Sequence, residues 1–216
     1  ETVAENNIKD RDFLLLGVGL SYKLKNRIEL YGNVSQNYRS VTFNDIRNVT
    51  PGQVIAENIT DEKGYTSDIG IRGQLSDKVS FDASVFGLYY NDKIAEFETN
   101  NPDGSVGAVR FRNNIGTALT YGFEAMIDWS LSKTFFAENQ QFTWNIFTNS
   151  AVTGSEYLES DEPNIKGNEV EFVPLLNFKT GTSVGYKNFM SSLQFMYVTS
   201  QFTDAKNGVT EKADNT

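Results

Sequence analysis

The sequence predicts an all-β protein in which about eight antiparallel strands form a segment of a transmembrane β-barrel. Three observations support this fold class. Apolar and polar residues alternate with a period of two over stretches of about ten residues. Aromatic residues make up 13% of the 216 residues, and 17 Gly against 4 Pro favour strands separated by glycine turns. Finally, the connections alternate between short and long.

The first four candidate strands are residues 12–22, 28–38, 65–75 and a segment that begins at 79. In the first, the even positions from Leu14 to Tyr22 are apolar. In the second and third, apolar residues such as Leu30 and Ile69 alternate with polar residues. The fourth alternates clearly up to Val85, after which Phe86, Leu88 and Tyr90 blur the two faces. Each segment therefore has the period of a strand with two unlike faces.

The last four candidate strands are residues 121–131, 142–152, 176–186 and 189–199. The first of these has the clearest alternation, with Phe123 and Ile127 on one face and Glu124 on the other. In a membrane barrel the polar face is the inner one, so we expect a set of charged residues to face the lumen and to pair across the wall. This set is Asp68, Arg72, Asp82, Glu124 and Asp128.

The short connections are residues 23–27, 76–78 and 187–188, with 132–141 somewhat longer, and the long ones are 39–64, 98–109 and 154–173. Outer-membrane barrels have short periplasmic turns and long extracellular loops. A soluble β-sandwich, the alternative, has no reason to place every long loop at one end. Aromatic residues near strand ends are candidates for the interfacial girdles: Tyr22, Tyr31, Tyr38, Tyr89, Tyr90, Tyr121, Trp129, Trp144, Tyr186 and Tyr197.

Composition excludes several functions. With 28 acidic and 19 basic residues the net charge is −9, so no nucleic-acid partner is expected. The chain has no Cys and no His, which removes disulfides, thiolate metal sites and the usual imidazole base. We therefore expect no enzyme activity, no catalytic residue and no resident cofactor or metal. The longest apolar run, 13–20, is too short for a membrane-spanning helix.

Several motifs resemble those of the TonB-dependent outer-membrane receptors, and more narrowly the ferric dicitrate type of Bacteroidetes-like bacteria. They are ELYGNVSQNYR at 29–39, FNDI at 43–46, DEKG at 61–64, IGIRG at 69–73, YGFE at 121–124 and QFTDA at 201–205. The resemblance implies that residues 1–216 are a C-terminal part of a larger barrel of about 22 strands, without the plug. It also implies a place in the Gram-negative outer membrane, in contact with lipid, a ferric chelate as ligand and contact with the TonB complex through that plug.

If the ligand is an anionic ferric chelate, arginines at the long-loop end are apt donors, since their planar fork matches carboxylate oxygens. The candidate ligand-binding residues are Arg39, Arg47, Arg110 and Arg112, helped by Asn37, Asn44 and Asn113. The alternative is that these arginines bind lipid phosphates or pair with loop carboxylates. Acidic residues between 156 and 171 could hold calcium or form a solvated surface, and their charge would repel an anionic chelate.

Two other functions stay open. A complete eight-stranded barrel would have a structural or small-ligand role, although residues 201–216 read as a polar loop rather than a closing strand. An importer of glycans or peptides could use the same large barrel. Such an importer would use loop aromatics to stack on its ligand, and the long loops offer Phe43, Tyr157 and Phe172.

Overall fold

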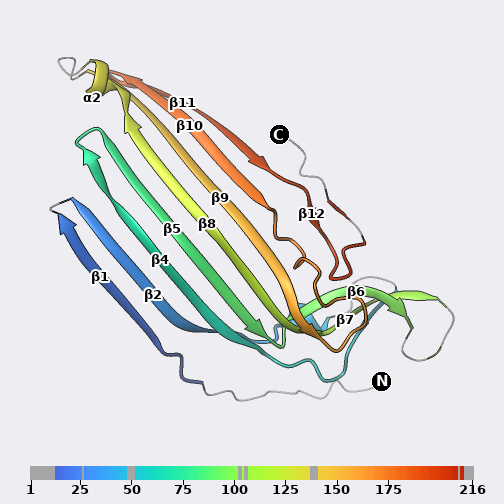
Figure 1. Ribbon diagram of the computed structural model, residues 1–216. Coiled ribbons are helices and arrows are strands. Elements are labelled where there is room, and N and C mark those ends of the chain that lie inside the picture. The colour runs from blue at the N-terminus through green and yellow to red at the C-terminus, as the bar shows by residue number, and fades with distance from the viewer. Residues whose placement is uncertain are drawn as a thin grey trace.

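The computed structural model describes residues 13–25, 27–47, 52–101, 104, 107–136, 141–208 and 210–211. Its main element is an open, eight-stranded antiparallel sheet (Figure 1). From edge to edge the strands are β1 (Gly17–Lys25), β2 (Ile28–Arg39), β4 (Glu62–Ser76), β5 (Val79–Asn91), β8 (Gly116–Ser130), β9 (Phe142–Ser160), β10 (Leu176–Tyr186) and β11 (Phe189–Val198). The predicted fold class and antiparallel arrangement are confirmed. Since β1 and β11 form opposite edges, the described strands do not close into a barrel.

Smaller elements lie in the connections. Helix α1 (Phe43–Ile46) and strands β3 (Gln53–Ile55), β6 (Ile94–Asn100) and β7 (Ala108–Asn114) lie at the end of the sheet that carries the long connections. There β6 and β7 form a hairpin, and β3 pairs with β7 in parallel. Strands β12 (Gln201–Phe202) and β13 (Thr210–Glu211) pair with each other. Helix α2 (Leu131–Phe135) lies at the opposite end (Figure 1).

Some predicted boundaries were wrong. Strand β1 begins at Gly17 rather than 12, and residue 12 lies outside the described residues. Strand β8 begins at Gly116 and β9 runs on to Ser160, so both are longer at the long-loop end than their alternation indicated. Strands β6 and β7 overlap only the two ends of the loop predicted at 98–109, and form a hairpin on either side of it that was not predicted. Leu131 begins a helix instead of ending a strand.

Strand register gives the sheet two unlike faces. Directly paired positions Leu20, Gly32, Ile69, Val85 and Phe123 share what we call the outer face. Its large apolar side chains are exposed, including Leu20 at 77% and Ile69 at 63%. The row Glu29, Arg72, Asp82, Met126, Asn149 and Lys179 lies on the other, inner face. An apolar outside with a polar inside is the pattern of a barrel wall in lipid.

The inner face also carries large residues that the sequence assigned otherwise. Tyr31 lies opposite Gly70, and its hydroxyl donates to the Asp82 carboxylate at 2.7 Å. Tyr90 lies opposite Gly64 on the same face. The prediction that Tyr31 and Tyr90 join an interfacial girdle was therefore wrong. Successive residues of a strand alternate between the two faces, and the register places both side chains on the inner face. The alternation that blurred after Val85 does continue, with large residues facing inward.

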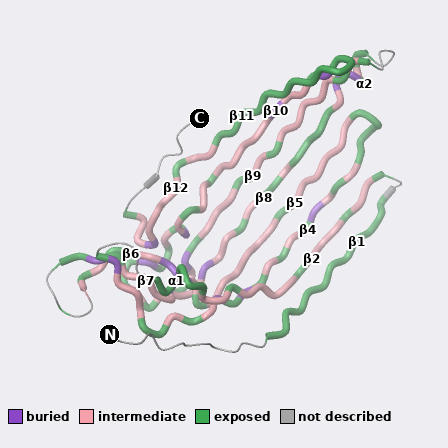
Figure 2. Tube along the Cα trace, turned by 180° about the vertical axis from the view of Figure 1, so that it is seen from behind, coloured by how far each residue is buried: buried purple, intermediate pink, exposed green. Residues whose placement is uncertain are grey.

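Buried residues gather at one end of the sheet (Figure 2). Every buried hydrophobic side chain among the described residues lies at the long-loop end, with the exception of Leu131. The wall itself is one layer thick and has no hydrophobic interior of its own, as expected where lipid covers one face. Among the described helices, none is long and apolar enough to cross a membrane.

Candidate functional site

The seven predicted ligand contacts all lie at the long-loop end of the sheet, which we call the mouth (the described residues within 37–47, 52–62, 91–101, 107–118, 155–175 and 199–208). Asn37 and Arg39 end β2, Asn44 lies in α1, and Arg47 follows α1. Arg110, Arg112 and Asn113 lie in β7. Helix α1 contacts β7 directly, because the Arg112 guanidinium donates to the Asn44 carbonyl at 2.6 Å. Residues far apart in the sequence thus meet at the mouth.

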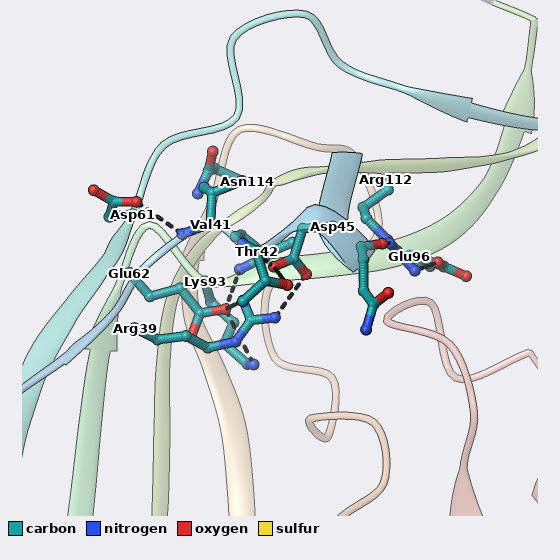
Figure 3. Close-up of polar contacts among 12 residues, drawn as sticks. Arg39, Val41, Thr42, Asp45, Asp61, Glu62, Lys93, Glu96, Arg112 and Asn114 are labelled. Carbon is teal, nitrogen blue, oxygen red and sulfur yellow. Dashed lines mark hydrogen bonds and ion pairs between the residues drawn. The ribbon is translucent and has the colours of Figure 1, made fainter. Parts of the chain in front are cut away.

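Arg39 lies at the centre of a network of charges (Figure 3). Its guanidinium donates to Asp45 at 2.6 Å and to Glu62 at 3.1 Å. The Glu62 carboxylate is only 1% exposed, accepts from the Ile94 backbone N–H at 2.9 Å and lies 3.5 Å from Lys93 Nζ. Burial of a carboxylate is costly unless such partners satisfy its oxygens. We call Arg39, Asp45, Glu62 and Lys93 the latch, since they tie the first long connection to β4 and β6.

Asp45 fixes the start of α1. Its carboxylate accepts from the backbone N–H of Thr42 at 2.8 Å and from the Thr42 hydroxyl at 2.7 Å. Partial burial works to raise the pKa of Asp45, but these hydrogen bonds and the neighbouring Arg39 outweigh it and hold the pKa below its usual value. The carboxylate is therefore charged at neutral pH and pairs with Arg39.

A second cluster surrounds Glu96 of β6. Arg112 donates to its carboxylate, the Gln53 side-chain amide donates at 2.7 Å, and Arg110 lies 3.5 Å away. The β-ladder explains this arrangement, since Glu96 pairs directly with Arg112, and Gln53 pairs with Arg110. The two arginines differ in exposure, because the Arg110 side chain is 58% exposed and that of Arg112 only 21%. More than half of the Arg110 side chain is therefore accessible to solvent.

The remaining predicted residues do not join these clusters through side-chain ion pairs. Arg47 is exposed and lies 5.9 Å from the centre of the Phe43 ring. The Asn37 amide donates to Thr66 at 2.9 Å, and its buried oxygen has no hydrogen-bond partner in the described part of the chain. Asn113 accepts from the backbone N–H of the next residue at 2.8 Å.

The mouth has its own hydrophobic core, formed by β6, β8, β9 and two loops. We call it the rim core; it consists of Ala95, Phe97, Ile115, Ala118, Tyr157, Ile165, Val170 and Ala205. The Tyr157 hydroxyl, inside this core, donates to Glu171 at 2.7 Å. Burial and the charge of Glu171 raise the pKa of Tyr157 well above its ordinary value, so the hydroxyl remains a donor.

Two asparagines join the loops above the rim core. The Asn207 side chain accepts from the Glu169 backbone N–H at 2.8 Å and donates to the Glu169 carbonyl at 2.9 Å, as a neighbouring strand would. Asn168 donates to the Ala205 carbonyl at 2.9 Å, and the Ala205 N–H donates to the Glu96 carbonyl at 3.1 Å. Loop 203–208 is therefore held between loop 161–175 and the β6–β7 hairpin.

A hollow of about 760 Å³ lies between that hairpin and loop 203–208. Arg110 and Lys206 line it together with Glu98, Thr99, Asn100, Ala108, Thr203, Asp204 and Gly208. Lys206 Nζ donates to the Glu98 carbonyl at 2.7 Å, and the Asp204 carboxylate accepts from the Lys206 and Gly208 backbone N–H groups. Its size is that of a small-molecule site, and its cations and amide groups suit a polar ligand.

Sequence reasoning missed the acidic partners of the arginines. Thr42 and Asp45 have the spacing of a helix capping box, so this pair had a local signal. Glu62 and Glu96 had no local sequence signal, because only the pairing of strands brings Glu62 opposite Arg39 and Glu96 opposite Arg112. Across the described residues, no three acidic side chains come close enough to hold a metal ion.

Together, an open antiparallel meander, an apolar outer face, a polar inner face and ordered loops at one end define the wall of an outer-membrane β-barrel. A family model for the TonB-dependent receptor-like β-barrel matches residues 2–215, and the chain belongs to this family. Barrels of this family lie in the outer membrane of Gram-negative bacteria, and we place the chain there. No curated protein matches the sequence.

Solved structures share the fold at low identity. The chain is similar to the ferric yersiniabactin uptake receptor FyuA from Yersinia pestis (TM-score 0.62, 20% identity, covering 91% of this chain and 27% of that one). It is also similar to the unliganded ferric citrate transporter FecA (0.62, 21%, covering 93% and 27%). A third similar structure is the copper transporter OprC (0.63, 17%, covering 86% and 26%). The chain thus spans about a quarter of each of these proteins.

Proposed function

We propose that this chain forms part of the barrel wall and mouth of a receptor that takes up a ferric chelate across the outer membrane. The chain would be a C-terminal part of a barrel of about 22 strands. The plug, and with it the contact with the TonB complex, would lie elsewhere in the same polypeptide. The share of each similar structure that the chain covers, about a quarter, supports this assignment.

The hollow beside Arg110 is the observation that carries the proposal. An anionic chelate needs cationic groups that are not fully occupied by protein carboxylates. Arg110 fulfils this condition, since its side chain is 58% exposed and its only ion pair within the described chain, with Glu96, is 3.5 Å long. Lys206 lines the same hollow. We assign ligand contact to Arg110, and to the exposed Arg47 as a second contact at the mouth.

The other two predicted arginines, Arg39 and Arg112, take supporting roles in this proposal. Arg39 is held by Asp45 and Glu62, and Arg112 by Glu96 and the Asn44 carbonyl. We propose that these two arginines mainly order the mouth, while Asn37, Asn44 and Asn113 remain candidate ligand contacts.

The similar structures include a ferric yersiniabactin receptor and a copper transporter, so the fold alone does not select the ligand. The arginines favour an anionic chelate. The glycan alternative needs accessible loop aromatics, and Tyr157 is fully buried in the rim core. Phe43 and Phe172 are exposed, at 69% and 59%, and would have to supply the stacking by themselves.

The test is equilibrium binding of ferric citrate and of a neutral ferric siderophore to the full-length receptor in detergent. We expect Arg110→Ala to weaken binding of the anionic chelate about tenfold or more, since a hydrogen bond to a charged group contributes roughly 1.5–3 kcal/mol. Arg110→Lys should recover only part of this loss, because the planar fork is missing. Lys166→Ala removes an exposed charge from loop 161–175 and serves as the matched control. Equal affinities for wild type and Arg110→Ala would refute the assignment.

A further inference from the structure

Helix α2 lies at the end of the sheet that carries the short turns (Figure 1), and its last residues contact the outer face. Trp129 lies on the outer face, in the same row as Val79 and Ile146. Its indole N–H donates to the Thr134 hydroxyl at 2.9 Å, and its ring lies 6.3 Å from that of Phe135. These contacts place the C-terminal half of α2 beside the apolar surface and not over the lumen.

The residue after α2 makes a similar contact. The Phe136 ring meets the Phe142 ring edge to face at 5.3 Å, and Phe142 shares its row with Tyr186 and Phe189. The aromatic group at this end is therefore continuous with the outer face; we call it the turn-end aromatic group, and it consists of Trp129, Phe135, Phe136, Phe142, Tyr186 and Phe189.

Much of this group is uncovered by protein. Phe135 is 64% exposed and Phe189 is 71% exposed. Contiguous apolar area of this kind is costly in water, whereas aromatic rings are favoured at the boundary between hydrocarbon and headgroups. The lipid that covers the outer face of a membrane barrel provides this boundary at the ends of its strands.

One lysine flanks the aromatic group. Lys133 of α2 points to the other side, because its ammonium donates to the Asp77 carbonyl at 3.4 Å and its side chain lines a hollow with the inner-face residues Asp128 and Asn145. Lys187 occupies the turn between β10 and β11, and its ammonium lies 5.3 Å from the centre of the Tyr186 ring. A lysine with an apolar stem beside a ring and an ammonium free to reach outward suits a phosphate at the membrane surface.

We propose that α2 is an interfacial anchor, which inserts Phe135 and Phe136 into the periplasmic leaflet while Lys187 of the neighbouring turn binds a phospholipid phosphate group. Short turns of outer-membrane barrels face the periplasm, which fixes the leaflet. The proposal does not depend on the identity of the cargo. It explains why one short connection contains a helix with exposed aromatic residues rather than a polar turn like residues 77–78.

Site-directed spin labelling of the full-length receptor in vesicles of phosphatidylethanolamine and phosphatidylglycerol tests the proposal. The chain contributes no cysteine of its own, so Phe135→Cys gives one label in this region. We expect the label to be accessible to oxygen, shielded from a water-soluble nickel complex, and about 5–10 Å below the phosphates. Leu193→Cys on the outer face and Gln74→Cys on the inner face serve as lipid and water references.

A label at 135 that is as accessible to the nickel complex as the label at 74 would overturn the anchor. Phe136→Cys repeats the measurement, so that poor folding of one variant does not decide the outcome. Headgroup binding is tested by adding Lys187→Glu to the labelled protein. We expect the label to move toward water by several ångströms, and an unchanged depth would overturn the lysine contact.

Discussion

Removal of the Arg39 guanidinium tests whether the latch orders the first long connection. In Arg39→Ala, Glu62 keeps Lys93 as its only cationic partner in the described structure, and Asp45 loses its 2.6 Å ion pair. Breaking a buried pair costs about 3–5 kcal/mol, and an exposed pair about 0.2–1 kcal/mol. Because Glu62 is 1% exposed but Arg39 is 43% exposed, we expect about 2 kcal/mol.

Hydrogen exchange of backbone amides in the full-length receptor measures this cost. The Thr42 N–H is bonded to the Asp45 carboxylate, and the Ile94 N–H to the Glu62 carboxylate. A loss of about 2 kcal/mol should speed their exchange by roughly 30-fold. Amides in the centres of β9 and β10 should exchange as before, since local opening at the mouth leaves the ladder intact.

Arg72→Ala is the matched control, since Arg72 is also half-exposed and pairs with a carboxylate, Glu29 at 3.3 Å, but lies in the wall. It should leave the exchange of Thr42 and Ile94 unchanged. Equal exchange rates in Arg39→Ala and wild type would refute the latch. If chelate binding fell while exchange stayed the same, Arg39 would be a ligand contact and the assignment of roles made above would be reversed.

Three further predictions concern other parts of the chain. A Cβ on Gly70 would lie 2.5 Å from Tyr31 and 2.8 Å from the Ala83 carbonyl. Gly70→Ala should therefore destabilise the barrel by about 1–3 kcal/mol and lower its thermal midpoint. A Cβ on Gly87 would lie 3.6 Å from the nearest atom, the Ser67 hydroxyl, so Gly87→Ala should leave the midpoint unchanged. The pKa of Asp45 is lowered in the folded state, so the latch should be intact above the unfolded pKa of about 3.9 and should open as the pH falls through the folded pKa. The exchange rate of the Thr42 amide, corrected for its intrinsic pH dependence, should show this opening. Asp45→Asn should abolish the pH dependence. Phe97 is 1% exposed, so Phe97→Ala should cost about 3–5 kcal/mol locally and expose loops 161–175 and 203–208 to protease, whereas the exposed Phe43→Ala should change neither.

The wall could be predicted from the sequence because lipid and lumen impose opposite polarities on neighbouring residues. Phe123 and Glu124 lie on opposite faces as their alternation predicted. Prediction was wrong at Tyr31 and Tyr90, where residue type suggests an interface but register places the side chain inside. A large inner side chain is accommodated there because the facing position is Gly70 or Gly64. The glycine that makes room for each tyrosine lies on a neighbouring strand. The alternation within one strand therefore cannot predict where such a large inner side chain fits.

The mouth was predictable only in part. Position beside a predicted long connection placed Arg39 and Arg110 correctly at the long-loop end of the sheet, but their charge partners come from other strands. Extensions of β8 and β9 beyond the alternating segments were missed because lipid no longer enforces a period of two there. Above the membrane both faces of these strands contact protein, so Ala118 and Tyr157 pack in the rim core instead of alternating with polar residues.

This difference between wall and mouth bears on how ligand selectivity is built. In the wall, a substitution acts through lipid or lumen and through the side chain directly opposite on the next strand, as at Tyr31 and Gly70. In the mouth, Glu96 connects Arg110, Arg112 and Gln53, and its backbone carbonyl also holds Ala205. Replacement of one arginine therefore changes the charge available to a ligand and, at the same time, the support of loop 203–208, which forms the other side of the hollow. Binding data for mouth variants separate the two effects only when loop order is measured on the same protein.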